Sequence, residues 1–560
     1  MRISLLAKES PAQLPFLMLA AAFFFFPFLW SVHLFDWDEI NFAESAREML
    51  LTGNYSQVSI NFKPFWEKPP LFFWLQSLSM QLFGVNEFAA RFPNAVFGML
   101  TLMSFYLIGK RHFDGRFGFL WALSYLGSLL PHLYFKSAII DPVFNLFIFL
   151  GLYFLFLCIE AYRQPAARKW ALWAGIFTGL AILTKGPVGL LLVLLSFLSF
   201  WAWQRFRAVA DIWSVLIVAA GIFVVSSAWY ALEVAKNGWW FFEEFIRYQI
   251  RLLVTADAGH EQPFFYHFLV VFIGCFPMSA FALKSLWKAE AADSASQGAF
   301  RKLMLCLFWV VMIVFTIVRT KIVHYSSMAY FPVSFLSAYT LYYLLEADTV
   351  PKKHIMWILG VLGSIFSLIL IGVPIFAYNK ELFYPLLQDP FALASLQTEV
   401  SWGGWEFLIG VVYLVLMGWG IWQIGRARLQ RGVLSLFLAA AFCLWGYLAI
   451  IVPKIEAYSQ RPAISFYKEL KGQDVYVSPL WFKSYAHYFY FEMPRYTHAE
   501  VYDERGQLNE QWLLYGEADK PVYFVLKASD RERVAREHPH LEYIKHQGGF
   551  ALYKRKVSAL

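Results

Sequence analysis

Charged residues are scarce in this sequence, and their scarcity excludes an ordinary soluble protein. Only 15% of the 560 residues are Asp, Glu, Lys or Arg, whereas 59% are hydrophobic. Soluble domains carry roughly 25% charged residues, so most of this chain must be buried in something other than its own core. The stretches 190–203 and 357–377 contain no charge, and a spanning helix needs about 20 apolar residues. The composition predicts an all-α polytopic membrane protein.

Cysteine is also rare. The four residues lie far apart and inside apolar runs, at Cys158, Cys275, Cys306 and Cys443. This spacing argues against a disulfide framework and against a cysteine metal site. We interpret the four side chains as small buried hydrophobic groups.

Nucleotide-binding motifs and internal repeats are missing. The sequence contains no G-x-x-x-x-G-K-[ST] phosphate loop and no dinucleotide fingerprint. Their absence disfavours a nucleotide-driven pump and an enzyme that uses nucleotide sugars. The net charge of +8 is interpreted through membrane topology, and no nucleic-acid partner is expected.

The sequence does contain about thirteen apolar runs that qualify as membrane spans. We predict spans at 11–32, 89–109, 117–134, 142–161, 170–183, 187–203, 211–230, 264–287, 303–319, 325–346, 354–377, 405–424 and 432–452. The chain then divides into a transmembrane domain, 1–453, and a C-terminal domain, 454–560.

Basic residues gather in every second loop between these runs. The series is Lys110, Arg111 and Arg116, then Arg163, Arg168 and Lys169, then Arg205 and Arg207, then Lys288, Arg301 and Lys302, then Lys352 and Lys353, then Arg426, Arg428 and Arg431. Because basic loops stay on the cytoplasmic side, the N-terminus is predicted to be cytoplasmic. The alternate loops, including 33–88 and 231–263, and the C-terminal domain then face the periplasm of a bacterial inner membrane.

The C-terminal domain has the pattern of a small soluble α/β domain. Strands are predicted at 474–477 and 521–526, and a hairpin at 541–553 that turns at Gly548 and Gly549. Ser529 and Glu532 have the spacing of a capping box that opens a helix ending near Glu537.

The first outer loop, 33–88, is long and rich in reactive side chains. It opens with Asp36, Trp37, Asp38 and Glu39, and apolar residues at helical spacing follow. We expect a surface helix there, with a second interfacial helix at 71–83. The acidic residues either cap the first helix or do chemistry, and the sequence leaves both roles open. Lys68, followed by two prolines, either snorkels to the headgroups or holds a lipid phosphate.

Other outer loops add further charged and polar residues to the same face. Asp141 precedes Pro142 at the start of the fourth span, which is also ordinary helix-start chemistry. Cations or polar groups stand in the remaining outer loops at Lys185, Arg247, His260, Lys321, His324 and Tyr325. Together they place several cations and carboxylates where the phosphate of a lipid substrate would lie.

These motifs resemble those of a known family. Asp38-Glu39-x-x-x-Ala43-Glu44-x-x-Arg47-Glu48-Met49 and Glu67-Lys68-Pro69-Pro70 are similar to the bacterial aminoarabinose transferases that modify lipid A. More broadly they resemble the protein O-mannosyltransferase superfamily of membrane glycosyltransferases with the GT-C fold. The family usually has Arg-Tyr where this chain has Asn41-Phe42, so the sugar and the acceptor stay open.

The resemblance implies a membrane glycosyltransferase that takes a sugar from a polyprenyl phosphate, such as undecaprenyl phosphate, with inversion of configuration. The acceptor would be a lipid of the lipid A or lipopolysaccharide type, or a protein. Asp38 would be the catalytic carboxylate and Asp141 would assist it. Donor phosphate and substrate would be bound by Glu39, Lys68, Lys185, Arg247, Lys321 and Tyr325.

A divalent metal ion between Glu67 and His260 is a further implication of the resemblance, and no other cofactor is expected. The competing hypothesis is a transporter or flippase of lipid-linked sugars. That class would share the apolar spans and the basic outer residues, but it would need no acidic cluster in the first loop and would usually show repeated halves.

Overall fold

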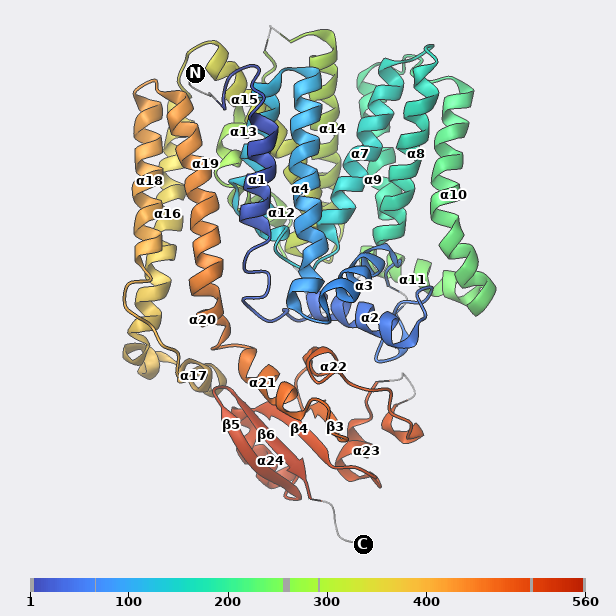
Figure 1. Cartoon of the computed structure of the whole chain (residues 1–560), viewed down its shortest axis with the longest axis vertical. Coiled ribbons are helices and arrows are strands. Elements are labelled where there is room, and N and C mark those ends of the chain that lie inside the picture. Colours follow the sequence, from blue (N-terminus) through green and yellow to red (C-terminus); the bar gives the residue numbers. More distant parts are fainter. Residues whose placement is uncertain (1–4, 66, 255–261, 291–292, 504–506, 557–560) are drawn as a thin grey trace.

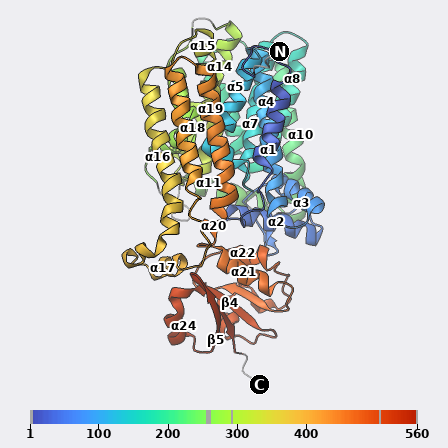
Figure 2. The same cartoon turned by 60° about the vertical axis from the view of Figure 1, so that its left-hand side comes forward.

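The computed structural model describes residues 5–65, 67–254, 262–290, 293–503 and 507–556. Long helices form one bundle, and a small sheet with its own helices lies beyond one end of it (Figure 1). The N-terminus lies at the opposite end of the bundle from this sheet, and the turned view gives the same arrangement (Figure 2). Chain ends on opposite sides of a bundle require an odd number of passes through it.

The bundle has a helical segment at each of the predicted spans. These are α1 (Gln13–Phe25), α4 (Glu87–His112), α5 (Gly115–Leu126) with α6 (Leu129–Tyr134), α7 (Asp141–Glu160), α8 (Ala166–Lys185), α9 (Val188–Trp203), α10 (Ile212–Asn237), α12 (Tyr266–Gly274) with α13 (Met278–Trp287), α14 (Ala295–Ile317), α15 (Tyr330–Glu346), α16 (Lys353–Tyr378), α18 (Leu408–Gly425) and α19 (Leu429–Gly446), which runs through η4 (Tyr447–Ile451) into α20 (Val452–Glu456). Among the described residues, 7 helices are long and apolar enough by themselves to cross a membrane. The polytopic helical fold is as predicted, and the count of thirteen stays a prediction.

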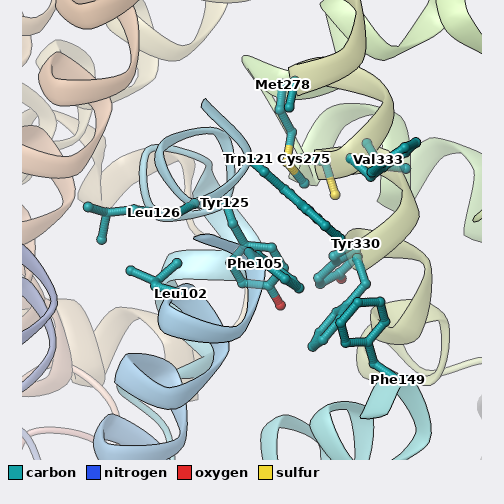
Figure 3. Packing of buried hydrophobic residues seen from close by; sticks show 14 of the residues in the cluster. Leu102, Phe105, Trp121, Tyr125, Leu126, Phe149, Cys275, Met278, Tyr330 and Val333 are labelled. Atoms are coloured by element: carbon teal, nitrogen blue, oxygen red, sulfur yellow. The ribbon is translucent and has the colours of Figure 1, made fainter. Parts of the chain in front are cut away.

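Aromatic packing dominates the interior of the bundle (Figure 3). The rings of Phe105 in α4 and Trp121 in α5 stack with their centroids 4.5 Å apart. The Trp121 indole N–H donates to Ser334 Oγ in α15 at 2.9 Å. Cys275 is buried in the same core. A buried indole with a satisfied N–H gains the packing of a large side chain without the penalty of an unpaired polar group.

The loop segments on the side of the C-terminal domain carry short elements. They are α2 (Asp38–Thr52), β1 (Ser59–Ile60), β2 (Lys63–Pro64), α3 (Leu71–Phe83), α11 (Trp240–Val254), η2 (Val323–Ala329), η3 (Lys380–Leu386) and α17 (Pro390–Leu396). Helices α2 and α3 lie across the ends of the membrane helices (Figure 1). Both interfacial helices predicted for loop 33–88 are therefore confirmed as helices.

Helix α2 is more deeply buried than a surface helix. Ile40, Ala43 and Ala46 share one hydrophobic cluster with residues of the C-terminal domain, such as Phe489 and Met493. The buried Arg47 side chain donates to the Met493 carbonyl at 3.0 Å. The C-terminal domain therefore packs on α2 and shares a core with it.

The C-terminal domain is a four-stranded sheet with short helices. Its elements are α21 (Arg461–Leu470), β3 (Tyr476–Pro479), α22 (Ala486–Tyr490), η5 (Ala499–Val501), α23 (Glu510–Tyr515), β4 (Val522–Lys527), η6 (Ala528–Asp530), α24 (Arg531–Glu537), β5 (Leu541–Gln547) and β6 (Phe550–Arg555). The strand order is β3-β4-β6-β5. Strands β3 and β4 are parallel, and the β4–β6 and β5–β6 pairs are antiparallel. The predicted α/β character, strands and hairpin are confirmed.

The capping box at Ser529 is wrong. Helix α24 begins at Arg531, its N-cap residue is Asp530, and no side chain caps it. Ser529 lies instead in the short 3-10 turn Ala528–Asp530. The turn displaces the helix start, so the Ser and Glu side chains do not meet the backbone groups that a capping box needs.

Candidate functional site

A buried ion pair joins two of the membrane helices at the ends that face the C-terminal domain (Figure 1). Lys185, the last residue of α8, donates to Asp141 Oδ1 in α7 at 2.6 Å. The Lys185 ammonium also lies 5.3 Å from the centre of the Tyr325 ring. The second carboxylate oxygen of Asp141, Oδ2, is buried and has no hydrogen-bond partner among the described residues. The carboxylate does not cap α7, which has no side-chain cap, so the structure turns it toward the site instead.

Asp38 reaches the same place from the first residue of α2. Its Oδ2 lies 3.6 Å from His324 Nε2, and Asp141 Oδ2 lies 4.0 Å from the same nitrogen. The Asp38 side chain keeps 46% of its surface exposed, and that of Asp141 only 4%. Helix α2 has no side-chain cap, so capping does not explain Asp38. One imidazole thus links the two carboxylates that the sequence singled out.

His324 was noted among the polar groups of the outer loops, but no pattern in the sequence assigned it a role at the site. It lies in η2, the short turn before α15. Burial lowers the pKa of His324; Asp141 and Asp38 act to raise it, and Lys185 and Lys68 act to lower it further. Its presence beside Tyr325 in an outer loop was the only signal that sequence offered.

Asp36 and Asp38 have separate environments although they are two residues apart. Asp36 Oδ2 accepts from Ser484 Oγ at 2.5 Å, and the Tyr485 backbone N–H lies 3.2 Å from Asp36 Oδ1. Asp36 therefore ties the first outer loop to the C-terminal domain, whereas Asp38 faces the cavity described next.

A cavity of about 1300 Å³ runs from between the membrane helices to the C-terminal domain. Its membrane limb is apolar and is lined by Val188, Leu190, Leu191, Leu192, Leu194, Val314 and Val318. Charged and polar groups line its middle, among them Asp38, Glu67, Lys68, Asp141, Lys185, Arg251, His324 and Tyr325. One cavity thus combines an apolar limb between the membrane helices with a charged chamber.

The third part of the cavity is a roof formed by the C-terminal domain. It is lined by Ser478, Pro479, Trp481, Phe482, Lys483, Ser484, Tyr485, His487, Tyr488, Gln507, Leu508 and Glu510. The Lys483 ammonium lies 4.2 Å from the centre of the Trp37 ring, directly beside Asp38 in the chain. From the sequence we predicted no site residue in the C-terminal domain. No local sequence pattern indicates which residues of one domain will contact residues of another domain.

The hairpin of β1 and β2 positions Lys63 and leads to Lys68. Ser59 pairs with Pro64, and Ile60 with Lys63. Asn61 and Phe62 at the turn both have φ of 56°, as a two-residue type I′ turn requires. The buried Glu48 carboxylate accepts from the Phe62 N–H at 3.0 Å and from Ser59 Oγ at 2.6 Å. Glu48 therefore holds the hairpin in place from below.

Glu39 lies in a buried polar network and does not line the cavity. Its carboxylate pairs with Arg91 of α4 at 2.7 Å and accepts from the Ala138 and Phe35 backbone N–H groups at 2.6 and 2.9 Å. Burial raises the pKa of Glu39, but the Arg91 charge and these hydrogen bonds outweigh it and leave the pKa below its ordinary value. This geometry suits an anchor for α2, and we propose that role in place of substrate binding.

Two of the predicted cations also stand apart from the cavity lining. Arg247 is paired with Glu244 at 2.6 Å and keeps 73% of its side chain exposed, whereas Arg251, one helical turn later, lines the cavity. Lys321 is buried and donates to the Val318 carbonyl at 3.0 Å.

Of the two residues predicted to bind a metal ion, the structure describes only Glu67. Glu67 lines the cavity, and its carboxylate lies 3.8 Å from Lys68 Nζ. His260 falls outside the residues that the structure describes. Within the described ranges, no group of three His, Cys, Asp or Glu side chains is arranged to hold a metal ion, so the site stays a prediction.

Comparisons with known proteins show which family and which solved structure this chain resembles. The pattern of the dolichyl-phosphate-mannose-protein mannosyltransferase family matches residues 67–230. The whole chain superposes on the crystal structure of ArnT from Cupriavidus metallidurans bound to undecaprenyl phosphate, with a TM-score of 0.72, 19% identity, and 98% and 99% of the two chains covered. The chain has the fold of ArnT.

Two sequence relatives that match about three quarters of the chain carry the same name. The undecaprenyl phosphate-alpha-4-amino-4-deoxy-L-arabinose arabinosyl transferase of Enterobacter sp. strain 638 is 27% identical over 437 residues, which are 76% of this chain and 73% of that one. The transferase of the same name from Shewanella sediminis is 24% identical over 439 residues, covering 76% and 74%. The resemblance inferred from the motifs of the first outer loop is thus confirmed. These relatives are named as transferases, which gives no support to the transporter hypothesis.

Proposed function

We propose that this chain is a membrane glycosyltransferase that moves a sugar from a polyprenyl phosphate to an acceptor under its C-terminal domain. The observation that carries the proposal is the single cavity that joins a leucine-lined channel to Asp38, Lys68, Asp141 and Lys185. A transporter needs an apolar path, but it does not need two carboxylates in a charged chamber at the end of that path.

The donor fits the membrane side of the cavity. Its prenyl chain would occupy the apolar limb, which burial of hydrocarbon favours by about 0.8 kcal/mol per CH₂ group. Its phosphate would then meet Lys68, whose side chain is only 16% exposed, and Arg251. Cations at this point stabilise the charge that gathers on the phosphate as it leaves.

The acceptor fits the opposite side. Inversion requires the nucleophile to approach the anomeric carbon from the face opposite to the leaving phosphate. In this scheme the phosphate lies beside Lys68, and the acceptor is bound by Asp38, Trp37 and the roof residues Trp481 and Lys483, which line the same cavity. Asp38 would orient the acceptor oxygen or take its proton, and Asp141, held by Lys185, would position the sugar or the acceptor.

The side of the membrane follows from the same scheme. Nucleotide sugars are confined to the cytoplasm, whereas a flipped polyprenyl phosphate sugar is available outside. We therefore propose that the cavity and the C-terminal domain are periplasmic and that the N-terminus is cytoplasmic, as the basic loops indicate. The sugar is left open, because Asn41 stands where the aminoarabinose transferases usually have an Arg. A protein acceptor remains an alternative to a lipid.

The decisive experiment compares envelope lipids and glycoproteins of a deletion strain with those of a strain that carries the gene. We expect one glycan modification to disappear on deletion and a polyprenyl phosphate sugar to accumulate, both restored by the wild-type gene. A flippase would give a different result. The donor would then accumulate only on the cytoplasmic side of the deletion strain, and adding external donor to that strain would restore the wild-type products.

A further inference from the structure

We propose that His324 is a catalytic residue that shares the proton of the acceptor with Asp38, and that the acceptor atom is therefore a hydroxyl oxygen. The inference rests on the proposed transferase function and deepens it. It distinguishes an alcohol acceptor, such as a sugar or a hydroxyamino acid, from a phosphate acceptor.

The geometry places the imidazole at the centre of the charged chamber. His324 Nε2 is 3.6 Å from Asp38 Oδ2 and 4.0 Å from Asp141 Oδ2. Both distances are too long for direct hydrogen bonds. They are short enough for an oxygen atom bonded to the imidazole to reach a carboxylate as well. The free Asp141 Oδ2 is the buried acceptor that such a bridging hydroxyl would satisfy.

The ring of His324 has no structural duty in the part of the chain that the structure describes. Two buried histidines of the helical bundle are held by the fold instead: His132 by the Leu126 carbonyl at 2.9 Å and His267 by Ser326 Oγ at 3.1 Å. The ring of His324 meets Tyr325 edge to face at 5.3 Å and makes no hydrogen bond to a described residue. It lines the cavity, so it is available to a substrate.

The charges around His324 suit a proton acceptor. Asp38 from α2, Asp141 from α7, Lys185 from α8 and Lys68 from the first outer loop all act on it. His267 of α12 lies near enough to interact with it, as does Lys321 with His267. The two carboxylates and the nearest two lysines oppose each other, and burial favours the neutral imidazole. A neutral imidazole has a free nitrogen lone pair and can accept the acceptor proton.

The step balances without any further reagent. The acceptor O–H bond breaks as the new bond from oxygen to the anomeric carbon forms. The electron pair of the bond between the anomeric carbon and the phosphate oxygen leaves with the polyprenyl phosphate. The acceptor proton passes to His324 Nε2, and Asp38 stabilises the resulting imidazolium. A phosphate acceptor is already ionised and needs no base, so a free imidazole against Asp38 favours a hydroxyl.

The first test is a pH profile of transfer by the purified full chain in vesicles of phosphatidylethanolamine and phosphatidylglycerol. The donor is the polyprenyl phosphate sugar fraction that the deletion strain accumulates, and the acceptor is the envelope fraction of that strain. His324→Gln should lower kcat by about 10²–10⁴-fold near neutral pH and remove the acid limb of the profile. The KM for the donor and the thermal shift induced by undecaprenyl phosphate should not change.

His132→Gln is the matched control, since it alters a buried histidine that neither lines the cavity nor acts on His324, and it should keep the wild-type profile. A His324→Gln variant with wild-type kcat, or with the same fractional loss at every pH, would overturn the catalytic role. A wild-type chain that transfers nothing would instead overturn the proposed function.

The second test is ³¹P NMR of the isolated product. A hydroxyl acceptor yields a glycoside and adds no phosphodiester signal, whereas a phosphate acceptor yields a glycosyl phosphodiester. Appearance of that phosphodiester signal would overturn the assignment of the acceptor even if His324 proved essential.

Discussion

Asp36 and Asp38 show how two neighbouring carboxylates acquire different roles. Asp36 is bonded to Ser484 and to the Tyr485 backbone, so its charge holds the roof on the first outer loop. Asp38 keeps nearly half of its side-chain surface open to the cavity and bonds to no cap. Their contacts thus distinguish Asp36, which supports the structure, from Asp38, which is free to contact a substrate in the cavity.

Asp38→Asn should abolish transfer and leave the fold intact. Asn keeps the shape and the hydrogen-bonding oxygen but cannot accept a proton or stabilise an imidazolium, and loss of such a group costs about 10²–10⁴-fold in rate. Because no cap bond is lost, the melting temperature in detergent should not change. The comparison variant is Asp36→Asn, which should lower the melting temperature with a smaller effect on rate. Near wild-type turnover of Asp38→Asn would move the catalytic role to Asp141.

Lys68→Ala should weaken donor binding. The Lys68 side chain is largely buried and lines the charged chamber, where a charge-assisted bond to phosphate is worth about 1.5–3 kcal/mol. We expect the KM for the lipid donor to rise by at least tenfold, and kcat to fall as the leaving phosphate loses its cation. Arg247→Ala, which alters an exposed arginine off the cavity, serves as control. Unchanged kinetics of Lys68→Ala would mean that the lysine only snorkels.

At the scale of elements, the hairpin of β1 and β2 depends on a buried acid of α2. Glu48 is fully buried and bonds to Ser59 and Phe62. Phe62 has a positive φ, which is costly for a residue with a bulky side chain. The bond from its N–H to Glu48 compensates for part of that cost. The hairpin in turn presents Lys63 to the cavity.

Glu48 should make the stability of the chain depend on pH. Burial, and then the nearby Glu44 charge, raise the pKa of Glu48 to about 8. The folded state therefore binds this proton more tightly than the unfolded state does. The contribution is fully present below the ordinary pKa of a glutamate and is lost as the pH rises from there to about 8. Glu48→Gln keeps the hydrogen-bonding oxygen without the charge, so this loss should vanish.

Thermal melting in detergent across this range of pH tests the prediction. Wild-type melting temperature should fall as the pH rises, and that of Glu48→Gln should fall less. Ser59→Ala, which removes one hydrogen bond to Glu48 but not the acid, should lower stability and keep the wild-type slope. Equal slopes for wild type and Glu48→Gln would show that Glu48 stays ionised in the fold.

The whole molecule places its two ends on opposite sides of the helical bundle (Figure 1). The C-terminal domain covers the cavity and shares a hydrophobic cluster with α2. The C-terminal domain therefore forms part of the cavity wall, and the predicted boundary at 453 falls between two parts of the chain that line one cavity.

Reporter fusions at both ends test the orientation of the whole chain. A cytoplasmic reporter should be active at the N-terminus, and a periplasmic reporter should be active after the C-terminal domain. This follows from the alternation of basic loops and from the separated ends of the bundle. An internal fusion after Lys353, predicted to be cytoplasmic, supplies the matched control. Activity of the same reporter at both ends would contradict an odd number of spans.

The sequence by itself determined the elements of this protein. Membrane helices follow from runs of apolar residues, because backbone groups in lipid must bond within their own helix. The interfacial helices, the strands and the hairpin of the C-terminal domain follow from local periodicity and turn residues. The acidic motif of the first outer loop also carried the resemblance to the aminoarabinose transferases. Asp38 and Lys68 of that loop, and Asp141 and Lys185 of later loops, were predicted as site residues, and all four line one cavity.

Only the tertiary structure decided which of these groups meet. Asp38 and His324 lie at 3.6 Å although they belong to opposite halves of the chain. Asp36 bonds to Ser484, and Glu39 turns away from the cavity to pair with Arg91. Such pairings depend on how helices and domains pack, and on the need of every buried charge for a partner. No local pattern encodes them, since the free energy that selects each partner arises only when distant segments exclude water together.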